Sequence, residues 1–507
     1  MPKHGGTDGA AYRRHDLAPP RSIKLDTPHR RHGEILSRIT ILLTLLSFAG
    51  CAAVPRVDTA TAPSRIAAPR VSGARGPLSQ LDAQAVFARL AAAAPNAGTL
   101  ERHLAVEQAV AESPLFTDNR VQVLQDGRET FPAMFDAIRG ARHYVDLEYY
   151  IFEDVSCNGT RLSDLLISKR QAGVEINVIY DAVGSIATPS DFLSRLQEAG
   201  VRLVQFNPLN PLKAKARYSI NDRDHRKMLI ADGDLVILGG VNLSSSYESA
   251  PQFQASTPDV GAGRNTAAEQ AAPDAGPPEV WRDIDVEISG PVITELEKLF
   301  RQHWSEQHGS SLDERAEPQP KESQGSEIVS IVGSSPSRLT SRYYVTVLSA
   351  IRNAEHNIWI TASYFVPTDQ EKDDLMQAAR HGIDVRLLLP SHSDSAPALA
   401  VQQSHYSGLL KAGVKIYERE KDVLHSKTMV VDTAWSIIGS SNFDHRSVLF
   451  NDEVDAVIIG ASTGKQLEKI FQDELQRAHR VDLASWRLRS TVAKLREQFW
   501  RLWQKLL

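Results

Sequence analysis

Two histidine–lysine pairs are the residues of this chain best suited to chemistry. The pattern HxKxxxxD occurs twice, 200 positions apart, as His225, Lys227 and Asp232 and as His425, Lys427 and Asp432. An imidazole can attack phosphorus or carry a proton, and an ammonium group can neutralise an anion. One such pattern arises by chance in many proteins, but a second copy at a fixed offset indicates a duplicated site.

A turn of small residues and an asparagine follow each pattern at the same distance. The first copy continues with Gly239, Gly240 and Asn242, and the second with Gly439, Ser440 and Asn442. We expect the glycines to let the backbone approach a bound anion closely. The asparagine amides add hydrogen-bond donors for the same anion.

Both patterns lie in aliphatic stretches that are typical of buried strands. On a strand, residues i and i+2 face the same side, so each histidine lies beside its lysine. If the two copies pack about a pseudo-twofold axis, both pairs converge on one pocket. Such a pocket suits a phosphodiester, because lysines and amides neutralise its oxygens while the histidines perform covalent and proton chemistry. No cluster with metal-ligand spacing accompanies the patterns, and we expect no metal or other cofactor.

Two acidic residues are candidates to orient the histidines. Asp283 and Glu453 precede matching strand patterns with an offset of 170, and a low-complexity insertion at 249–278 accounts for the difference from 200. A carboxylate that accepts Nδ1–H fixes the tautomer and leaves Nε2 free. Which histidine each carboxylate faces stays open, and either carboxylate could instead be exposed at a strand end. Asp232 and Asp432 either support a turn or belong to the site.

A longer repeat predicts the fold. The tripeptide Ala-Ile-Arg occurs at 137–139 and again at 350–352, each time before an apolar strand pattern. Helix and strand patterns alternate throughout. We therefore expect an α/β protein of two pseudo-twofold-related halves, each a sheet flanked by helices, that share one active site. The expected halves are residues 115–308 and 327–485, joined by a polar linker at 309–326.

The N-terminus is typical of an export signal. Arginines precede a run of twelve apolar residues at 39–50, which is too short to span a bilayer. The small residues before Cys51 resemble the signal of bacterial lipoproteins, in which the cysteine is lipidated. We expect 1–50 to be a leader, Cys51 the first mature residue, and 51–114 a tether, flexible at 52–77, with a helical segment. A marginal membrane helix or a buried strand is the alternative for the apolar run.

Composition and charge narrow the class of protein. The chain has 507 residues, of which 42% are hydrophobic and 23% charged, and it has two cysteines. These values exclude a multi-span membrane protein, a disordered chain and a disulfide scaffold. The net charge is −5, and residues 1–50 carry eight Lys/Arg against four Asp/Glu, so the remainder is more acidic still. This balance disfavours nucleic acid as a partner.

Residues 486–507 are expected to form one basic amphipathic helix. Large apolar residues recur at spacings of four and three from Leu488 to Leu506, and six Lys/Arg against one Glu follow from Arg487 onward. A basic, aromatic helix of this kind can lie in an anionic lipid interface. The alternative is a terminal helix packed on the core.

These features resemble those of the phospholipase D superfamily, most closely the bacterial cardiolipin synthases. The two HxKxxxxD stretches and the strand patterns around them carry the resemblance, which covers residues 115–507. It implies a metal-independent double displacement. His225 attacks phosphorus to give a phosphohistidine, and His425 protonates the leaving alcohol and then deprotonates the incoming one. His225 must then begin neutral and His425 protonated.

The function that this resemblance implies is that of an envelope phosphatidyltransferase. It would transfer a phosphatidyl group to phosphatidylglycerol on the periplasmic side of a bacterial envelope, held there by lipidated Cys51 and by the C-terminal helix. Because one chain carries both halves, a monomer is expected to suffice for catalysis. Three alternatives stay open: a phospholipase D hydrolase with water as acceptor, an envelope nuclease, and a phosphate-binding module without turnover. The acidic body disfavours the nuclease, and the intact histidines and lysines disfavour the binding module.

Overall fold

The computed structural model describes most of the chain beyond residue 70. The described residues are Val54, Arg56, Val57, 70–93, 114–210, Leu212, Ser219, 221–248, 281–312, 323–336 and 341–506. The expected leader, Cys51 and the insertion at 249–278 lie outside them. The described residues all belong to one compact unit, Ala52–Leu507.

The first half is built on a mixed sheet with the strand order β8-β7-β4-β10-β11-β13-β3. Strands β4, β7 and β8 are parallel, and the others are antiparallel to their neighbours. The bounds are β3 Leu115–Gln125, β4 Tyr144–Tyr149, β7 Glu175–Asp181, β8 Arg202–Phe206, β10 Lys227–Ala231, β11 Leu235–Gly239 and β13 Ile284–Ser289. A short hairpin of β5 (Ser156–Cys157) and β6 (Thr160–Arg161) lies outside this sheet.

The second half repeats this order strand for strand, as β17-β16-β15-β19-β20-β21-β14. The bounds are β14 Glu327–Ser334, β15 Asn357–Ala362, β16 Asp384–Pro390, β17 Lys415–Arg419, β19 Lys427–Val431, β20 Trp435–Gly439 and β21 Asn451–Ile459, with β22 (Ala478–Arg480) at the edge beside β17. The predicted duplicated α/β fold is confirmed.

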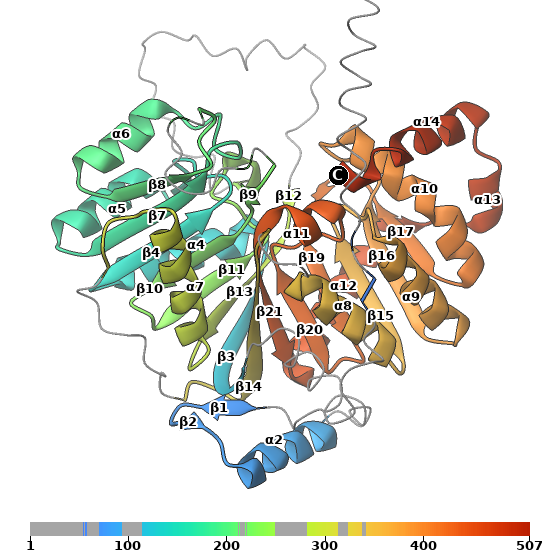
Figure 1. Cartoon of the computed structure of the whole chain (residues 1–507), viewed down its shortest axis with the longest axis horizontal. Coiled ribbons are helices and arrows are strands. Elements are labelled where there is room, and N and C mark those ends of the chain that lie inside the picture. The colour runs from blue at the N-terminus through green and yellow to red at the C-terminus, as the bar shows by residue number, and fades with distance from the viewer. Residues whose placement is uncertain are drawn as a thin grey trace, which may run out of the picture. The chain divides into compact units, whose positions relative to one another are not determined.

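Three strand pairings join the halves. β3 pairs with β14 in the middle of the molecule (Figure 1). β9 (Arg223–Asp224) of the first half pairs with the start of β21, and β12 (Trp281–Arg282) pairs with β18 (Val423–Leu424) of the second. Each of the last two pairings ends next to a histidine of the HxK patterns, so the joint between the halves fixes the histidines.

Helices cover the outer faces of the two sheets. In the first half these are α4 (Asp126–Gly140), α5 (Leu162–Gln171) and α6 (Ser190–Glu198), and in the second α8 (Arg342–Asn353), α9 (Asp369–Arg380) and α10 (Ala396–Ala412). A third apolar cluster between the sheets includes α7 (Ile293–Glu306) and Leu467 of α12 (Ala461–Leu475). Alternate residues of one strand serve different clusters. Leu229 of β10 faces α4, whereas Met228 and Ile230 face the inner cluster.

The expectation of a flexible tether is wrong for residues 71–77. β1 (Val71–Gly73) pairs with β3 and with β2 (Gly76–Pro77), and α2 (Gln80–Ala93) follows. Val71 is buried in the core of the second half, and Val57 packs against Tyr344 and Leu348. Among the described residues of this stretch, the apolar side chains that reach the core are scattered valines, so its composition resembles that of a linker although part of it extends the sheet.

The C-terminal segment is not a single helix. α13 (Leu483–Arg487) and α14 (Thr491–Arg501) are separated at Ser490, whose hydroxyl accepts the amide hydrogen of Ala493 and so begins α14. A 3₁₀ turn at Gln504–Leu506 follows. α14 packs on α10 with its apolar stripe turned outward: Val492, Leu495 and Phe499 of α14 and the flanking Leu488 and Leu502 are 54–86% exposed.

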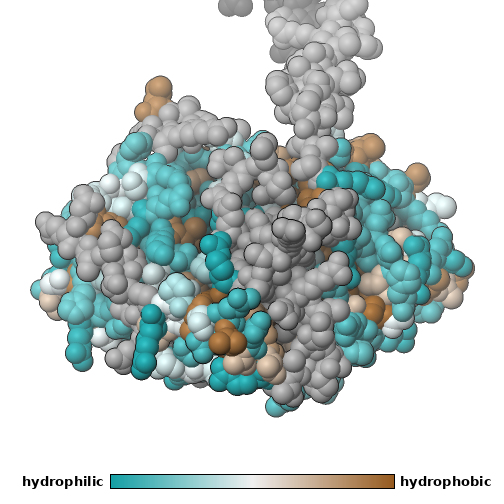
Figure 2. Space-filling view, turned by 60° about the horizontal axis from the view of Figure 1, so that its bottom comes forward, coloured by the Kyte–Doolittle hydropathy of each residue, from teal (hydrophilic) through white to brown (hydrophobic). Residues whose placement is uncertain are grey.

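Large exposed apolar side chains are otherwise dispersed. The face in Figure 2 is mostly hydrophilic, and its hydrophobic areas are small and separate. Within the part of the chain that the structure describes, no helix has the length and hydrophobicity needed to cross a bilayer.

Candidate active site

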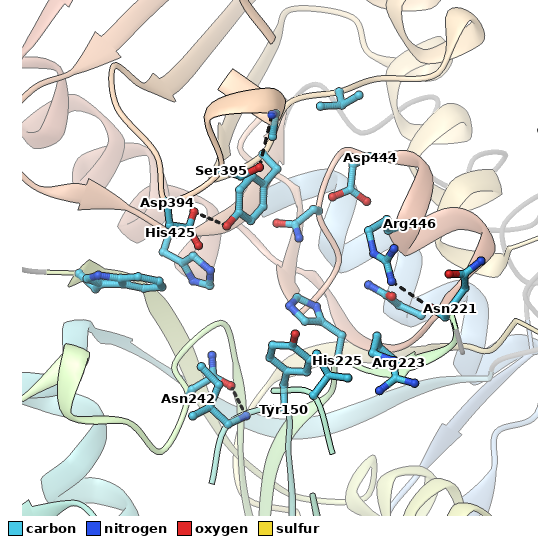
Figure 3. A pocket seen from close by; sticks show the side chains of 18 residues that line it. Tyr150, Asn221, Arg223, His225, Asn242, Asp394, Ser395, His425, Asp444 and Arg446 are labelled. Carbon is cyan, nitrogen blue, oxygen red and sulfur yellow. Dashed lines mark hydrogen bonds between the residues drawn. The ribbon is translucent and has the colours of Figure 1, made fainter. Parts of the chain in front are cut away.

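A cavity of about 490 Å³ lies where the two halves meet, and both histidines line it (Figure 3). Its wall draws on the ends of β4, β9, β12 and β21, on the loops after β7, β11, β15, β16 and β20, and on α11 (His445–Leu449). The polar and aromatic side chains that line it are Tyr150, Asn221, Arg223, His225, Asn242, Trp281, Tyr364, Asp394, Ser395, His425, Asn442, Asp444, Arg446 and Asn451.

Each histidine is held by a carboxylate from the opposite half. His225 Nδ1 lies 3.0 Å from Glu453 Oε2, and His425 Nδ1 lies 2.6 Å from Asp283 Oδ2. The backbone amides of His225 and His425 also donate across the joint, to the carbonyls of Asp452 and Arg282. With Nδ1 engaged, Nε2 of His225 is left for the cavity, whereas Nε2 of His425 also has Lys427 Nζ at 3.2 Å. The sequence left the partner of each carboxylate open, and the structure assigns a crossed arrangement.

The two carboxylates differ in their surroundings. Glu453 accepts hydrogen bonds from the hydroxyls of Ser440 (2.5 Å) and Ser447 (2.8 Å) as well as from Asn451. Burial alone would raise its pKa, but the neighbouring His225 and Lys227 and the hydroxyl of Ser440 lower the pKa of Glu453 to about 2. Glu453 is therefore an anion at every physiological pH.

Asp283 has fewer donors. In the first half Gly240 takes the place of Ser440, and a Cβ there would collide with the Asp283 carboxylate. Burial raises the pKa of Asp283 to about 6, although Lys427 and the amide of Ile284 oppose this rise. The His425–Asp283 pair can therefore take up a proton slightly below neutral pH, whereas the carboxylate beside His225 stays charged.

The lysines of the HxK patterns lie behind the histidines. Lys227 Nζ donates to the backbone carbonyl of His225 at 2.6 Å, and Lys427 Nζ donates to that of His425 at 2.5 Å and lies 3.2 Å from the His425 Nε2. Burial, which outweighs the attraction of Glu453, lowers the pKa of Lys227 to about 7. Burial also lowers the pKa of Lys427.

The substrate-free charge state of the histidines differs from the expectation. Burial lowers the pKa of His225, and burial together with Lys427 and Lys227 lowers the pKa of His425 well below its ordinary value. Both shifts favour neutral rings, which fits the nucleophile expected of His225 but runs against the protonated form expected of His425. Burial is the main cause at His425 and the two lysines add to it, and the negative charge of a bound phosphodiester would oppose the effect of the lysines.

The asparagines reach the cavity, but the glycines serve another purpose. Asn242 Oδ1 accepts the amide hydrogen of Ile151, and Asn442 Oδ1 accepts the hydroxyl of Ser363. A Cβ at Gly239 or Gly439 would collide with a buried aspartate two residues after Asp283 or Glu453. These glycines therefore make room for buried protein carboxylates, and the approach of their backbone to a phosphate stays a prediction.

Asp232 and Asp432 lie at the far ends of their strands from the histidines. Asp232 accepts the backbone amides of residues 142–144 at 2.7–2.8 Å, and Asp432 those of residues 355–357 at 2.8 Å. Both adopt a positive φ of 52°. Neither lines the cavity. Their contacts are those of residues that hold the turn before β4 and β15.

Several residues of the site were not anticipated from the sequence. The hydroxyl of Tyr247 lies 3.0 Å from His425 Nδ1, and the rings of Trp281 and His425 are 4.8 Å apart. Asp394 and Arg446 reach the cavity from loops and from α11. Arg226, which lies between His225 and Lys227 and is buried beneath them, is the one residue of this group with a signal in the sequence, because it is a charged residue inside an apolar strand pattern. Loop residues carry no periodicity that could have revealed the others.

One group of described side chains could in principle share a metal ion, namely Glu148, Asp224 and His303. All three are buried beside the first HxK pattern. Arg226 already donates to Glu148 at 3.1 Å, and His303 Nδ1 lies 2.7 Å from the same carboxylate oxygen. Arg226 and His303 therefore already supply the positive charge beside Glu148 that a metal ion would supply.

A duplicated α/β fold in which two histidine–lysine patterns share one cavity defines a PLD-like enzyme. The family description "Cardiolipin synthase, PLD-like domain" matches residues 134–250 and 347–475. The chain is 32% identical over 389 residues to cardiolipin synthase 2 of Bacillus anthracis, covering 76% of this chain and 70% of that protein. It is 30% identical over 407 residues to a cardiolipin synthase of Geobacillus sp. strain WCH70, covering 80% and 76%.

The chain thus belongs to the cardiolipin synthase family. Its fold is also similar to a solved phosphatidylserine synthase of Haemophilus influenzae Rd KW20, with a TM-score of 0.57 and 13% identity over 81% of this chain and 100% of that one.

The low pKa of Lys227 predicts an alkaline loss of activity. Below pH 7 the ammonium form attracts an anionic phosphodiester, and above pH 7 the free enzyme loses this charge. We expect kcat/KM to fall up to about tenfold per pH unit above pH 7. Lys227→Arg keeps the charge, so its alkaline limb should move upward in pH. An alkaline limb at the same pH in both proteins would assign it to another group.

Proposed function

We propose that this protein forms cardiolipin by transferring a phosphatidyl group to phosphatidylglycerol through a phosphohistidine. The observation that carries the proposal is the crossed arrangement, in which one cavity holds two histidines whose Nδ1 atoms are both engaged by carboxylates. Membership of the cardiolipin synthase family supports the same activity.

In the first step His225 Nε2 attacks the phosphorus of the donor lipid. The nitrogen–phosphorus bond forms while the bond from phosphorus to the head-group oxygen breaks, and that oxygen takes the Nε2 proton of His425. Glu453, which remains an anion, stabilises the positive charge that develops on the His225 ring. A donor phosphate supplies the negative charge that favours the protonated form of His425.

In the second step a hydroxyl of phosphatidylglycerol replaces the departed alcohol. His425 Nε2 takes the proton of this hydroxyl, its oxygen bonds to phosphorus, and the nitrogen–phosphorus bond breaks. Cardiolipin leaves, and His425 holds the proton for the next turnover. Water in place of phosphatidylglycerol would give phosphatidic acid, so the hydrolase is the second candidate function.

Labelled phosphatidylglycerol in mixed micelles, incubated with the full chain and a chelator, separates these outcomes. Cardiolipin plus glycerol is the expected result. Phosphatidic acid without cardiolipin would make the protein a hydrolase. The absence of any lipid product, with turnover of DNA instead, would contradict the proposal in favour of a nuclease.

We propose further that the C-terminal segment docks the cavity on a lipid surface. The exposed apolar stripe of α14 is accompanied by six Lys/Arg from Arg487 onward. On its inner side Trp500 packs against Val366 and Ala398, which line the cavity. Exposed Val183, at the other side, also lines the cavity. Apolar side chains thus flank the cavity where an anionic membrane would present its head groups.

Replacement of both Leu495 and Phe499 by serine should weaken binding to anionic vesicles at least tenfold. Burial of each side chain in lipid contributes about 1.5–3 kcal/mol, and about 1.4 kcal/mol corresponds to a factor of ten. Co-sedimentation with phosphatidylglycerol vesicles measures this. Leu81→Ser is the control, since Leu81 is at least as exposed as Leu495 and Phe499 but lies on α2 at the opposite end of the molecule (Figure 1). If the stripe instead joins two copies of the chain, the double substitution would change the oligomeric state and leave vesicle binding intact.

The location of the protein follows as a proposal from residues outside the described part. Lipidation of Cys51 would hold the enzyme on the periplasmic side of the envelope. Mass spectrometry of the mature N-terminus tests this, and an unmodified Cys51 would contradict it.

A further inference from the structure

The wall of the cavity carries charges of both signs. Arg223 and Arg446 lie on the side of His225, with Asp444 near Arg446, whereas Asp394 lies beside His425 (Figure 3). Arg223 is paired with Asp181 at 3.3 Å. No described lysine or arginine pairs with Asp394, which is exposed to the cavity. The carboxylate of Asp394 is therefore available to a ligand.

Hydrogen bonds hold Asp394 in place from one side. Its Oδ1 accepts the hydroxyl of Tyr364 at 2.5 Å and that of Ser393 at 3.1 Å. None of the hydrogen bonds among the described residues uses Oδ2. Oδ1 of Asp394 is thus fixed by the protein, whereas Oδ2 has no hydrogen-bond donor among the described residues.

Two aromatic rings stand beside His425, and the hydroxyl of one of them, Tyr364, donates to Asp394. The ring centroids of Trp281 and Tyr364 lie 4.8 Å and 6.3 Å from that of His425, and both residues line the cavity. The faces of tryptophan and tyrosine attract organic cations, and a nearby carboxylate adds to this attraction. A neutral polyol could use the carboxylate but would gain nothing from the aromatic faces.

We propose that Asp394, Trp281 and Tyr364 form a subsite for an ammonium-bearing head group, so that an ethanolamine phospholipid is the preferred phosphatidyl donor. The inference rests on the proposed function, in which His425 protonates the departing alcohol. Because attack and departure are roughly in line at phosphorus, the head group leaves on the side opposite His225, which is the side of Asp394.

The first step then releases ethanolamine. The His225–phosphorus bond forms, the bond from phosphorus to the ethanolamine oxygen breaks, and this oxygen takes the proton of His425. The ammonium group keeps its charge throughout. Phosphatidylglycerol afterwards supplies its hydroxyl as the acceptor in the same place.

The test compares two labelled donors with an excess of unlabelled phosphatidylglycerol as acceptor, using the full chain in mixed micelles. Each donor is labelled in its head group, and the release of labelled ethanolamine or labelled glycerol gives kcat/KM for phosphatidylethanolamine and for phosphatidylglycerol as donors. Asp394→Asn removes the charge but keeps an acceptor for Tyr364. We expect the wild-type protein to prefer phosphatidylethanolamine, and Asp394→Asn to reduce use of this donor at least tenfold more than use of phosphatidylglycerol. Asp136→Asn, on the exposed face of α4, is the matched control and should keep the wild-type ratio.

Two results would overturn the inference. If Asp394→Asn changes the use of both donors by the same factor, or if the wild-type protein prefers phosphatidylglycerol, Asp394 does not select an ammonium group. If the wild-type protein makes cardiolipin from neither donor, the proposed function itself fails, and the subsite fails with it.

Discussion

His225→Ala is expected to abolish both cardiolipin formation and covalent labelling of the enzyme. No other described histidine that lines the cavity has Glu453 beside it, and loss of a covalent nucleophile costs about 10⁴-fold or more. Labelled phosphatidylglycerol, a quench in alkaline detergent and gel electrophoresis at alkaline pH measure the phosphatidyl-enzyme directly, because the nitrogen–phosphorus bond is labile in acid. Appreciable residual turnover in this variant would reject His225 as the nucleophile.

His425→Ala should behave differently, and this difference assigns the two roles. Loss of a general acid and base slows both steps by about 10²–10⁴-fold with a natural lipid. With phosphatidyl-p-nitrophenol, whose phenolate leaves without a proton, the first step should survive. The expected result is one equivalent of nitrophenolate per enzyme, followed by a stalled phosphatidyl-enzyme. His225→Ala is the control and should give no burst. A burst in His225→Ala and none in His425→Ala would mean that the roles are reversed.

The sequence was sufficient for the parts of the site that repeat. The 200-residue offset relates His225 to His425, and the 170-residue offset relates Asp283 to Glu453, so all four could be named before the structure. It could not show that the carboxylates cross between the halves, because a repeat identifies equivalent positions and not which of two equivalent partners lies nearby. That choice depends on how the halves dock.

Features that do not repeat were harder to predict. Ser440 and Gly240 are equivalent positions, yet one donates to Glu453 and the other makes room for the shorter Asp283. The segment 486–507 has the predicted apolar stripe, but periodicity does not reveal whether a stripe faces the core or the solvent. The break at Ser490 follows from a capping hydrogen bond that a count of apolar residues does not register.

Arg226 illustrates how this asymmetry bears on stability. It is 2% exposed and lies between the motif residues His225 and Lys227, where the second half has Ser426. Its guanidinium donates to Glu148 at 3.1 Å in its own half. It also donates to Asp452 Oδ1, to the carbonyl of Glu453 and to that of Ser334 in the other half, each at 3.4 Å. The buried guanidinium of Arg226 therefore joins the two halves directly beneath His225.

Removal of this cation should destabilise the protein strongly. Arg226→Ala leaves Glu148 and Asp452 buried without it, and breaking a buried ion pair from one side costs about 3–5 kcal/mol. Chemical denaturation measures the free energy of unfolding of Arg226→Ala and of the control Ser426→Ala, at the equivalent position of the second half. Ser426→Ala removes one hydroxyl hydrogen bond at 3.3 Å, and we expect it to lose about 1 kcal/mol of stability.

The pH dependence of the stability difference between wild type and Arg226→Ala identifies the cause of the stability loss. In the wild-type protein the charges of Arg226 and His303 overcome the effect of burial and lower the pKa of Glu148. Without Arg226, His303 alone opposes the effect of burial on Glu148, and we expect the pKa of Glu148 to rise above its unfolded value. Between pH 7 and pH 5 the folded variant then binds a proton that the unfolded chain does not bind. The stability gap between wild type and Arg226→Ala should therefore narrow between pH 7 and pH 5. A gap that stays constant over this range would mean that the loss comes from packing of the long side chain and not from the uncompensated carboxylates.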